Sequence, residues 1–456
     1  MSNQASRREF LKRASALSVT GVAAPWALNL AAIGQAAAAG ATDYKALVCV
    51  FLYGGNDYAN TLVPYDSASY ALYQGQRAAI ALPYASLANT VLKPTIALAN
   101  AREYALAPEL QPLVPIFDAG QMAVMLNIGN LVEPITKDEY INKSKRRPPK
   151  LFSHNDQQSL WQSSAPEGST SGWGGRMGDL FASGNGNATF TCVSAAGNAV
   201  YLSGTSAVQY QVSPTGSVQL SGLKAPLFGS QACSDALRSL VTAPRTHLFE
   251  AEHTRVMTRS IAADESLRAN LKDNLTTPFP IDNPLAAQLK IVARMIEARV
   301  ALGAKRQVFF VSLGGFDTHD GILEDHPALM ATVGQALAAF QATISNELGI
   351  AESVTTFTAS DFGRTLTTDG DGSDHGWGSM HFALGGAVKG KAFYGKAPMI
   401  ANNGDDDVGQ GRLLPSMAVD QFGATLATWF GVSDTEMKTV LPNIGNYTLR
   451  NLGFLA

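Results

Sequence analysis

The chain has 456 residues, of which 46% are hydrophobic and 16% are charged, and its formal net charge is −3. This near-neutral balance excludes a nucleic-acid partner that is held by charge alone, and the hydrophobic content is too high for a disordered chain. A chain of this length can bury a large core, as one α/β unit or as two or three domains.

The N-terminus carries an export motif. The segment SRREFLK, residues 6–12, pairs two arginines with Phe-Leu-Lys, and a mildly apolar stretch with an alanine-rich end follows it. We therefore predict a twin-arginine signal peptide over residues 1–41, passage through the twin-arginine translocase, and a periplasmic or secreted protein. Pro25 and Asn29 interrupt the apolar stretch, which predicts no stable membrane span after cleavage.

Three cysteines remain after the predicted signal peptide, and their spacing matches no zinc motif. Cys49 lies in an apolar run and is interpreted as a core residue. Cys192 and Cys233 could pair in an oxidising compartment, or each could stay free.

Continuous apolar runs predict the strands of a parallel sheet that is buried on both faces. These runs are residues 45–55, 121–130, 306–315, 353–363 and 380–388. Helical patterns predict helices over residues 283–304, 326–348 and 420–431, and a more polar helix over residues 253–273. The helix over 326–348 joins two of the strands, so those two strands should run parallel to each other.

The middle of the chain differs from this pattern. Residues 186–225 alternate small, β-branched and turn residues, which predicts short antiparallel strands in a cap or an inserted subdomain. The basic run over residues 143–150 is interpreted as a solvated loop. The pattern as a whole favours an α/β protein with a mostly parallel sheet and a small β-rich insertion.

Polar side chains gather after three of the predicted strands. Ligands of parallel sheets bind beyond the carboxyl ends of the strands, where glycines let the backbone approach a ligand closely. Carboxylates and imidazoles gathered there would repel one another or stay unpaired without a cation, so the sequence predicts a metal site. The residues concerned are Asn56, Asp57, Asp317, His319, Asp320, Asp361, Arg364, Asp374, His375 and His381.

Several of these residues also have a structural interpretation. Asp57 could equally cap a helix, Asp320 is expected to begin the following helix, and His381 opens an apolar run and could be a core histidine. The distribution of histidines favours a site, because four of the chain's seven lie in or beside glycine-rich strand ends. These four are His154, His319, His375 and His381.

Residues 150–164 predict the start of a helix. Ser153 would be the N-cap, with Asp156 three residues later as in a capping box. The functional interpretation is that the positive helix end would stabilise an anion beside Ser153 and His154. The chain has no phosphate-binding loop, Gly-x-Ser-x-Gly elbow or dinucleotide fingerprint, and it lacks the downstream blocks of calcineurin-like metallophosphoesterases.

A set of longer motifs resembles the exported domain-of-unknown-function family fifteen-oh-one, over nearly all of the mature chain. These motifs are FLYGGNDYANTLVP, FSHNDQQSLWQ, SGWGGRMGDL, LGGFDTHDG, SDFGRT and GSDHGWGSMHFALGGAVKGKAFYG. That family is grouped with the alkaline phosphatase-like superfamily, which contains sulfatases. The resemblance implies one three-layer α/β/α domain over residues 42–456, with metal ions at the carboxyl edge of the sheet.

The resemblance also implies roles for individual residues. Ser153 falls where the nucleophile-bearing helix of sulfatases begins, and Phe362 stands where the superfamily usually has a metal-ligating histidine. That departure implies one metal rather than two, or none, although Asp374 with its neighbouring histidine could compensate. The implied ligands of a divalent zinc, calcium or manganese ion are Asp57, Asp317, His319, Asp361 and His375.

We therefore expect an exported metal-dependent hydrolase that acts on phosphate or sulfate esters, with a small anionic ester or polymer as substrate. Arg364 would clamp the oxyanion, His154 and His381 would act as acid or base, and Asn56 and Arg176 would contact the substrate. The alternative is a non-catalytic periplasmic binding protein that keeps the fold without a complete metal site, and the substituted histidine position supports it.

Overall fold

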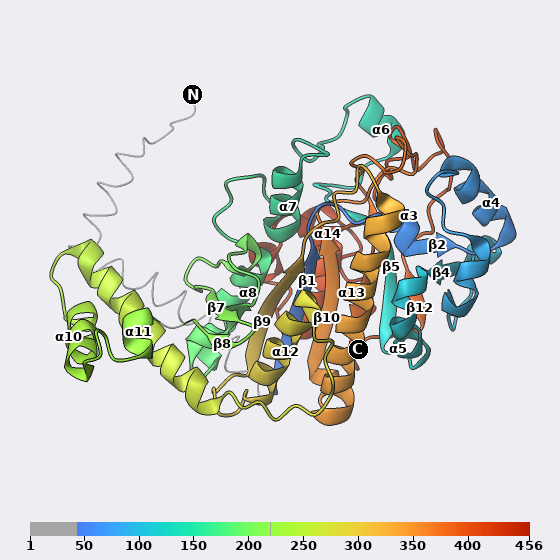
Figure 1. Cartoon of the computed structure of the whole chain (residues 1–456). Helices are drawn as coiled ribbons and strands as arrows, with labels where there is room; N and C mark the ends of the chain where they lie inside the picture. Colours follow the sequence, from blue (N-terminus) through green and yellow to red (C-terminus); the bar gives the residue numbers. More distant parts are fainter. Residues whose placement is uncertain (1–42, 219) are drawn as a thin grey trace, which may run out of the picture.

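The computed structural model describes residues 43–218 and 220–456, so the predicted signal peptide lies outside the described residues. The main sheet has the strand order β12-β5-β11-β10-β1-β9-β6-β7-β8, and β13 pairs with β5 (Figure 1). Among the described strands of this sheet, β11 and β8 run antiparallel to their neighbours and the others pair in parallel. The strands are β1 (Lys45–Leu52), β5 (Met122–Gly129), β6 (Cys192–Ser194), β7 (Tyr210–Ser213), β8 (Gly216–Ser217), β9 (Arg306–Leu313), β10 (Val354–Ser360), β11 (Ser379–Leu384), β12 (Ala392–Tyr394) and β13 (Met417–Ala418).

The central strand β1 is apolar on both faces, and each face packs into a separate hydrophobic cluster. Val48 and Val50 belong to one buried hydrophobic cluster, whereas Cys49 and Phe51 belong to another on the opposite face. Successive side chains of a strand point to opposite sides of the sheet. A continuous apolar run is therefore the pattern of a strand covered by helices on both sides.

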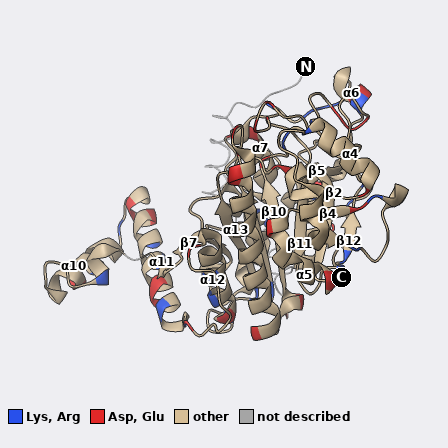
Figure 2. Cartoon of the chain, turned by 45° about the vertical axis from the view of Figure 1, so that its right-hand side comes forward, with Lys and Arg blue, Asp and Glu red and all other residues tan. Residues whose placement is uncertain are grey.

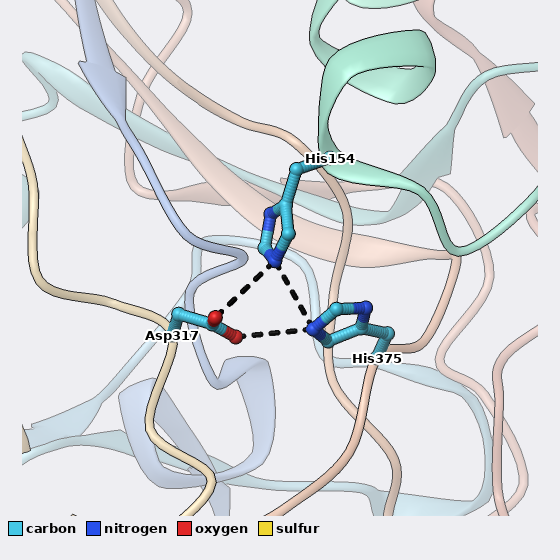
Figure 3. Close-up of side chains that lie close together, drawn as sticks. All are labelled: His154, Asp317 and His375. Atoms are coloured by element: carbon cyan, nitrogen blue, oxygen red, sulfur yellow. Dashed lines mark hydrogen bonds and ion pairs between the residues drawn. The ribbon is translucent and has the colours of Figure 1, made fainter.

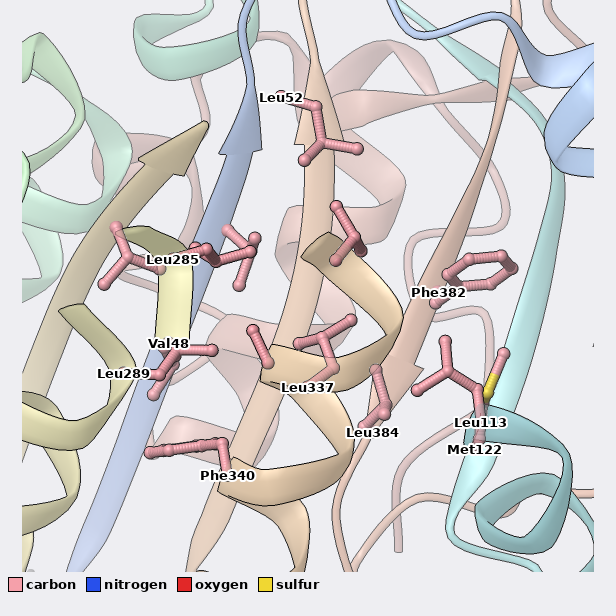
Figure 4. Packing of buried hydrophobic residues seen from close by; sticks show 14 of the residues in the cluster. Val48, Leu52, Leu113, Met122, Leu285, Leu289, Leu337, Phe340, Phe382 and Leu384 are labelled. Atoms are coloured by element: carbon pink, nitrogen blue, oxygen red, sulfur yellow. The ribbon is translucent and has the colours of Figure 1, made fainter. Parts of the chain in front are cut away.

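The first covering layer contains α12 (Pro284–Glu297) and α13 (Ile322–Ala342). Asn283 caps α12 by accepting a hydrogen bond from the Ala286 amide, as its sequence signal predicts. Figure 4 shows leucines of both helices packed against β1 and its neighbours. This layer covers the largest buried hydrophobic cluster of the described residues.

The second layer covers the opposite face with α7 (His154–Ser163), α8 (Trp173–Phe181) and α14 (Val419–Phe430). Trp161 and Phe422, from α7 and α14, pack edge to face with ring centroids 6.2 Å apart. Both belong to the cluster that contains Phe51 of β1. The three-layer α/β/α architecture is thus confirmed.

The predicted parallel arrangement of two strands around a helix is also confirmed. The strands β9 and β10, joined through α13, lie on either side of β1, and both run parallel to it. The helical segment Ile322–Glu347 is long and apolar enough to cross a membrane by length and composition, but half of its most apolar window is buried within the protein. It packs against α12 and shares a buried hydrophobic cluster with β1, as is typical of a core helix.

The segment 186–225 requires a correction. The predicted short strands are present, but β6 and β7 run parallel to β9 and extend the main sheet, and of the strands in this segment only β8 is antiparallel to its neighbour. The helices α10 (Gln231–Thr242) and α11 (Leu248–Asn270) follow and project from the main body (Figures 1 and 2). All three cysteines are free, so Cys192 and Cys233 are not bridged.

A small sheet stands beside the main one, in the order β2-β4-β3. Its strands are β2 (Leu62–Pro64), β3 (Val91–Leu92) and β4 (Tyr104–Leu106). The remaining α-helices of the described residues are short or peripheral: α3 (Tyr58–Thr61), α4 (Ser67–Gln76), α5 (Val114–Asp118), α6 (Lys137–Ile141), α9 (Ser221–Lys224) and α15 (Met437–Val440).

Candidate metal centre

Four polar side chains meet at the carboxyl edge of the main sheet. Asp317 and His319 follow β9, His375 lies in the loop before β11, and His154 is the first residue of α7. Figure 3 shows His154, Asp317 and His375 pointing at one another from three separate segments of the chain. Parallel strands bring their carboxyl ends to one edge, so residues far apart in sequence converge there.

The ring nitrogens of the three histidines converge closely. The Nε2 atom of His375 lies 3.0 Å from Nε2 of His154 and 2.9 Å from Nε2 of His319. Oδ1 of Asp317 lies 3.1 Å from Nε2 of both His375 and His319, and its Oδ2 lies 3.4 Å from Nε2 of His154. Tetrahedral zinc with bonds of about 2.0–2.1 Å places its ligand atoms roughly 3.3 Å apart, close to these separations. Within the described residues, the groups that could hold an ion are His154 with Asp317 and His375, and His319 with Asp374 and His375.

The second nitrogen of two of these histidines is held by an oxygen atom. Nδ1 of His154 lies 2.7 Å from Oδ2 of Asp361, and Nδ1 of His375 lies 2.8 Å from the carbonyl oxygen of Phe152. With Nδ1 protonated and donating, Nε2 keeps its lone pair for a metal. Phe152 has φ of 73°, a left-handed conformation that is costly for a residue with a side chain and is typical of functional sites.

The pKa values of two of these histidines shift in opposite directions without a metal. The hydrogen bond to Asp361 raises the pKa of His154 above its usual value. Burial lowers the pKa of His375, which favours the neutral ring that binds metals. The site therefore presents at least one neutral imidazole at neutral pH.

Asp361 lies directly behind His154, at the end of β10. Its Oδ2 atom accepts hydrogen bonds from the Gln158 side chain at 2.8 Å and the Gly54 amide at 3.3 Å. Its Oδ1 atom is buried and has no hydrogen-bond partner among the described residues. Asp361 thus orients a histidine through one oxygen, while its other oxygen lies outside the residue groups that could hold a metal ion.

Asp374 also lies beside the centre. One of its carboxylate oxygens can share a cation with ring nitrogens of His319 and His375. The same carboxylate accepts hydrogen bonds from the His375 amide at 2.7 Å and from Arg412 at 2.7 Å. Asp374 therefore holds the His375 loop in place whether or not it contacts a metal.

Arg364 does not face open space, as an oxyanion clamp would require. Its side chain is fully buried, and its donors contact the carbonyl oxygens of Ser373 and Gly54 and Oδ1 of Asp317, the last at 2.9 Å. Partial burial would raise the pKa of Asp317, but the hydrogen bond and charge of Arg364 outweigh it and hold that pKa below its usual value. Arg364 is a positioning residue for Asp317.

Asp57 lies apart from the histidines, contrary to the predicted ligand set. Its carboxylate caps α3 through the Asn60 amide, pairs with Arg77 at 2.6 Å and accepts a hydrogen bond from Ser373 at 2.8 Å. Complete burial would raise the pKa of Asp57, but the neighbouring Arg77 guanidinium holds it below its usual value. A guanidinium therefore neutralises this carboxylate where a metal was predicted.

Asn56 and His381 were also predicted as site residues, but both are buried and contact other residues of the fold. Asn56 is buried and bonds to Thr61 and His326, so it cannot reach a substrate in solution. His381 lies in the core against Trp161, and burial lowers its pKa to about 3, which removes it from acid–base work near neutral pH.

Arg176 is likewise committed to the fold. Its guanidinium donates to the backbone carbonyl oxygens of Ser163, Ser171 and Val440. These bonds tie α7, α8 and the C-terminal end of α15 together. Arg176 therefore stabilises the second helical layer, and its guanidinium is occupied by these carbonyl oxygens.

Ser153 stands at the N-cap of α7, as predicted, but it does not cap the backbone. Its hydroxyl donates to Oδ2 of Asp156 at 3.1 Å, and no side-chain capping bond is formed. The residue is half-buried and immediately precedes His154. It lies next to the candidate metal centre and to the positive end of a helix.

Phe362 packs against two histidines of the candidate centre. Its ring centroid lies 4.9 Å from that of His154 and 4.8 Å from that of His375. A Cβ atom on Gly55 would lie 2.4 Å from the Phe362 ring, so the glycine makes room for it. Phe362 supports two of the imidazoles by packing and supplies no ligand atom.

Three supporting residues escape the sequence analysis. Gln158 could have been found from helical spacing, because it lies four residues after His154 and so shares its face of α7. Phe152 acts through its backbone carbonyl and Arg412 through a bond of 2.6 Å to the His375 carbonyl oxygen. The residue pattern of the sequence does not predict either of these last two contacts.

We expect Gly54→Ala to destabilise the protein and displace Asp317. A Cβ atom there would lie 2.4 Å from the Asp317 backbone nitrogen, and Gly54 has φ of +116°. The free energy of unfolding should fall by about 1–3 kcal/mol or more, and the affinity for zinc should fall with it. Chemical denaturation and zinc titration measure both effects.

Gly120→Ala is the matched control, because Gly120 has φ of +77° but no neighbouring atom within 4 Å of the place that a Cβ would take. It should carry only the backbone cost of about 1–2 kcal/mol and leave the affinity for zinc unchanged. Equal effects of both substitutions on zinc binding would show that the close approach of residue 54 to Asp317 is unimportant.

The fold and the site define an α/β protein with a histidine-rich candidate metal centre at the carboxyl edge of its main sheet. The chain belongs to the family described as "Protein of unknown function (DUF1501)", whose model matches residues 44–437. No curated protein sequence matches the chain significantly.

Solved structures with a similar arrangement of elements include two bacterial proteins. The PsFucS1 sulfatase from Pseudoalteromonas sp. is 10% identical, covers 94% of this chain and 76% of its own, and has a TM-score of 0.38. The lipoteichoic acid synthase LtaP from Listeria monocytogenes is 8% identical, covers 88% of this chain and 78% of its own, and has a TM-score of 0.32. These values are too low to transfer any function, so the chemistry rests on this chain's own residues.

Proposed function

We propose that this protein is an exported hydrolase of phosphate or sulfate esters that depends on one divalent metal ion, with zinc as the best fit. The convergence of three Nε2 atoms and one carboxylate supports the metal most directly. Imidazole nitrogens suit zinc, whereas calcium and manganese prefer sets dominated by oxygen. The export part of the proposal rests on the twin-arginine motif, which lies outside the described residues.

The proposed ligands are His154, His319, His375 and Asp317. When bound, zinc would polarise an ester oxygen and lower the pKa of a bound water. The side chains of His319 and Asp317 are 40% and 45% exposed, so one side of the centre is open to solvent. A substrate would enter from that side, while Phe362 and the buried Asp361 close the other.

The N-terminus of α7 supplies the anion-binding part of the proposal. Ser153 precedes the helix, whose free amides and dipole favour a negative charge. Its hydroxyl contacts Asp156, a carboxylate that could take the proton when the serine oxygen attacks phosphorus or sulfur. Ser153 is therefore the proposed nucleophile: its oxygen bonds to phosphorus or sulfur as the bond to the leaving-group oxygen breaks, and that oxygen takes the proton from Asp156. Water would then cleave the ester formed on Ser153 and release phosphate or sulfate.

A second candidate function is non-catalytic binding in the periplasm. Its specific support is Phe362, a ring that packs on two of the histidines where a further ligand could have stood. The buried pair of Asp57 and Arg77 adds to this support, because it removes another carboxylate from the ligand set. A protein of this kind would keep the fold and bind a partner or a cell-surface polymer without turnover.

Metal analysis of protein purified without a nickel column, combined with hydrolysis of 4-nitrophenyl phosphate and 4-nitrophenyl sulfate, tests the proposal. We expect a stoichiometric metal, turnover of at least one ester, and loss of both in Asp317→Ala. Arg238→Ala, at an exposed residue of α10, serves as the control and should change neither. Unchanged metal content in Asp317→Ala would refute the ligand set, and metal without turnover would favour the binding protein.

A further inference from the structure

A polar cleft of about 280 Å³ lies along α7, next to the metal centre. One wall is the face of α7 that carries Asn155, Gln158, Ser159 and Gln162. These positions are three or four residues apart, so they lie on one side of the helix. Tyr53, at the end of β1, and two loops complete the walls; the loops comprise residues 167–169 and 198–200.

The cleft is connected to the metal centre through shared residues. Gln158 lines the cleft and donates to Asp361, which in turn holds His154. A helix rises about 1.5 Å per residue, so the lining residues of α7, from Asn155 to Gln162, extend over roughly 10 Å, beginning one residue after His154. A group bound in the cleft would therefore be adjacent to an ester held at the metal centre.

The lining has the hydrogen-bonding chemistry of a neutral ligand rich in hydroxyl groups. Amides supply donors and acceptors side by side, as the two partners of a hydroxyl group require. Burial raises the pKa of Tyr53 to about 12, so its hydroxyl stays protonated and can donate. The one charged side chain of the lining is Glu167, an acceptor that lies 3.5 Å from the Asn155 amide and 4.0 Å from the Lys150 ammonium.

Other ligand classes fit this lining less well. A phosphate or sulfate group would require cationic side chains, and neither lysine nor arginine lines the cleft. A peptide segment would require pockets for apolar side chains, but the apolar aliphatic side chains of the lining are Ala199 and Val200 alone.

We propose that this cleft binds a sugar unit of the substrate, so that the ester is a phosphate or sulfate carried by a carbohydrate. The metal centre would take the anionic group and the cleft the neutral, hydroxyl-rich part. This substrate class rests on the proposed function, but sugar binding by the cleft can be measured independently of hydrolysis.

The test measures binding of unesterified oligosaccharides by saturation-transfer NMR. The probes are maltotriose, cellotriose, mannotriose, chitotriose and galactobiose, each added to the full metal-loaded protein. We expect at least one to bind, and Glu167→Ala/Asn198→Ala to weaken it by about tenfold, because two polar partners are lost. Both residues are exposed and lie outside the metal centre, so the variant should fold and keep its metal.

Glu250→Ala/Asn274→Ala, at exposed positions outside the cleft, is the matched control and should bind the sugar as the wild type does. Absence of binding across the panel would overturn the proposal, and so would binding that Glu167→Ala/Asn198→Ala leaves unchanged. Sugar binding without hydrolysis of an aryl ester, or of a phosphate or sulfate ester of the sugar that binds, would refute the hydrolase and leave the sugar site in place. Hydrolysis without sugar binding would support the hydrolase and refute the sugar site.

Discussion

His375→Ala should abolish tight zinc binding. The Nε2 atom of His375 lies within 3.1 Å of His154, His319 and Asp317, so it stands at the middle of the converging ligand atoms. Loss of a residue that merely orients a ligand costs about 10–100-fold in metal affinity, and loss of this ligand should cost more than about 100-fold. Competitive titration of zinc against a chelator measures the change.

Thermal unfolding gives a second measure of the same result. A ligand at 100 times its dissociation constant stabilises the folded state by about 2.7 kcal/mol, so zinc should raise the Tm of the wild type and leave that of His375→Ala unchanged. His253→Ala, at an exposed position of α11, is the control and should respond to zinc as the wild type does. Wild-type zinc affinity in His375→Ala would refute the four-residue centre.

Arg77→Met should be strongly destabilising. Arg77 and Asp57 form an ion pair of 2.6 Å in which both side chains are fully buried. Removal of one partner leaves an uncompensated buried charge, which typically costs about 3–5 kcal/mol. Urea denaturation should show this loss near neutral pH, whereas Arg238→Met, in an exposed pair with Glu265, should lose no more than about 1 kcal/mol.

The pH dependence identifies the cause of this loss. The pKa of Asp57 is lowered in the folded wild type, so its contribution is present at neutral pH and is lost only as the pH falls below about 4, the pKa of an unfolded aspartate. In Arg77→Met, burial without a partner should raise that pKa, so the deficit should shrink between about pH 8 and pH 5. A deficit that is independent of pH would indicate lost packing instead of an unpaired charge.

The double variant Asp57→Asn/Arg77→Met removes both charges of the same pair. It should recover part of the stability, because it removes the unpaired carboxylate. It should also keep the wild-type affinity for zinc, since Asp57 is bonded to Arg77 and Ser373 and lies apart from the three histidines. Loss of zinc binding in this variant would return Asp57 to the ligand set.

The main elements of the fold could be predicted because their signals are local. An apolar run such as 45–52 can be stable only where both faces are covered, and β1 is covered by two helical layers. Asn283 followed by a proline marks the start of α12, because a helix cap and a proline at the first helical position act on neighbouring residues only. The pairing of β6 and β7 could not be predicted in this way, because short strands carry no sign of their partner or direction.

The candidate site could be predicted in outline but not in detail. The placement of Asp317, His319 and His375 follows from their position beside buried strands, where a parallel sheet gathers its ligands. The partner of Asp57 could not be found in this way. Arg77 lies at the end of the next long helix, and its buried contact with Asp57 depends on how α4 turns back toward the sheet.

The sequence by itself determined an α/β protein with a mostly parallel sheet that is buried on both faces, the edge of the sheet at which polar residues gather, and the chemical types available there. These properties depend on periodicity and on residues close in the chain. The tertiary structure decided which of those residues share a centre: it brought His154 from α7 to His319 and His375, and it assigned Arg364 to Asp317 and His381 to the core. The physical reason is that a ligand set is defined by distances of about 3 Å between side chains from separate segments, and such distances are fixed only when the layers pack.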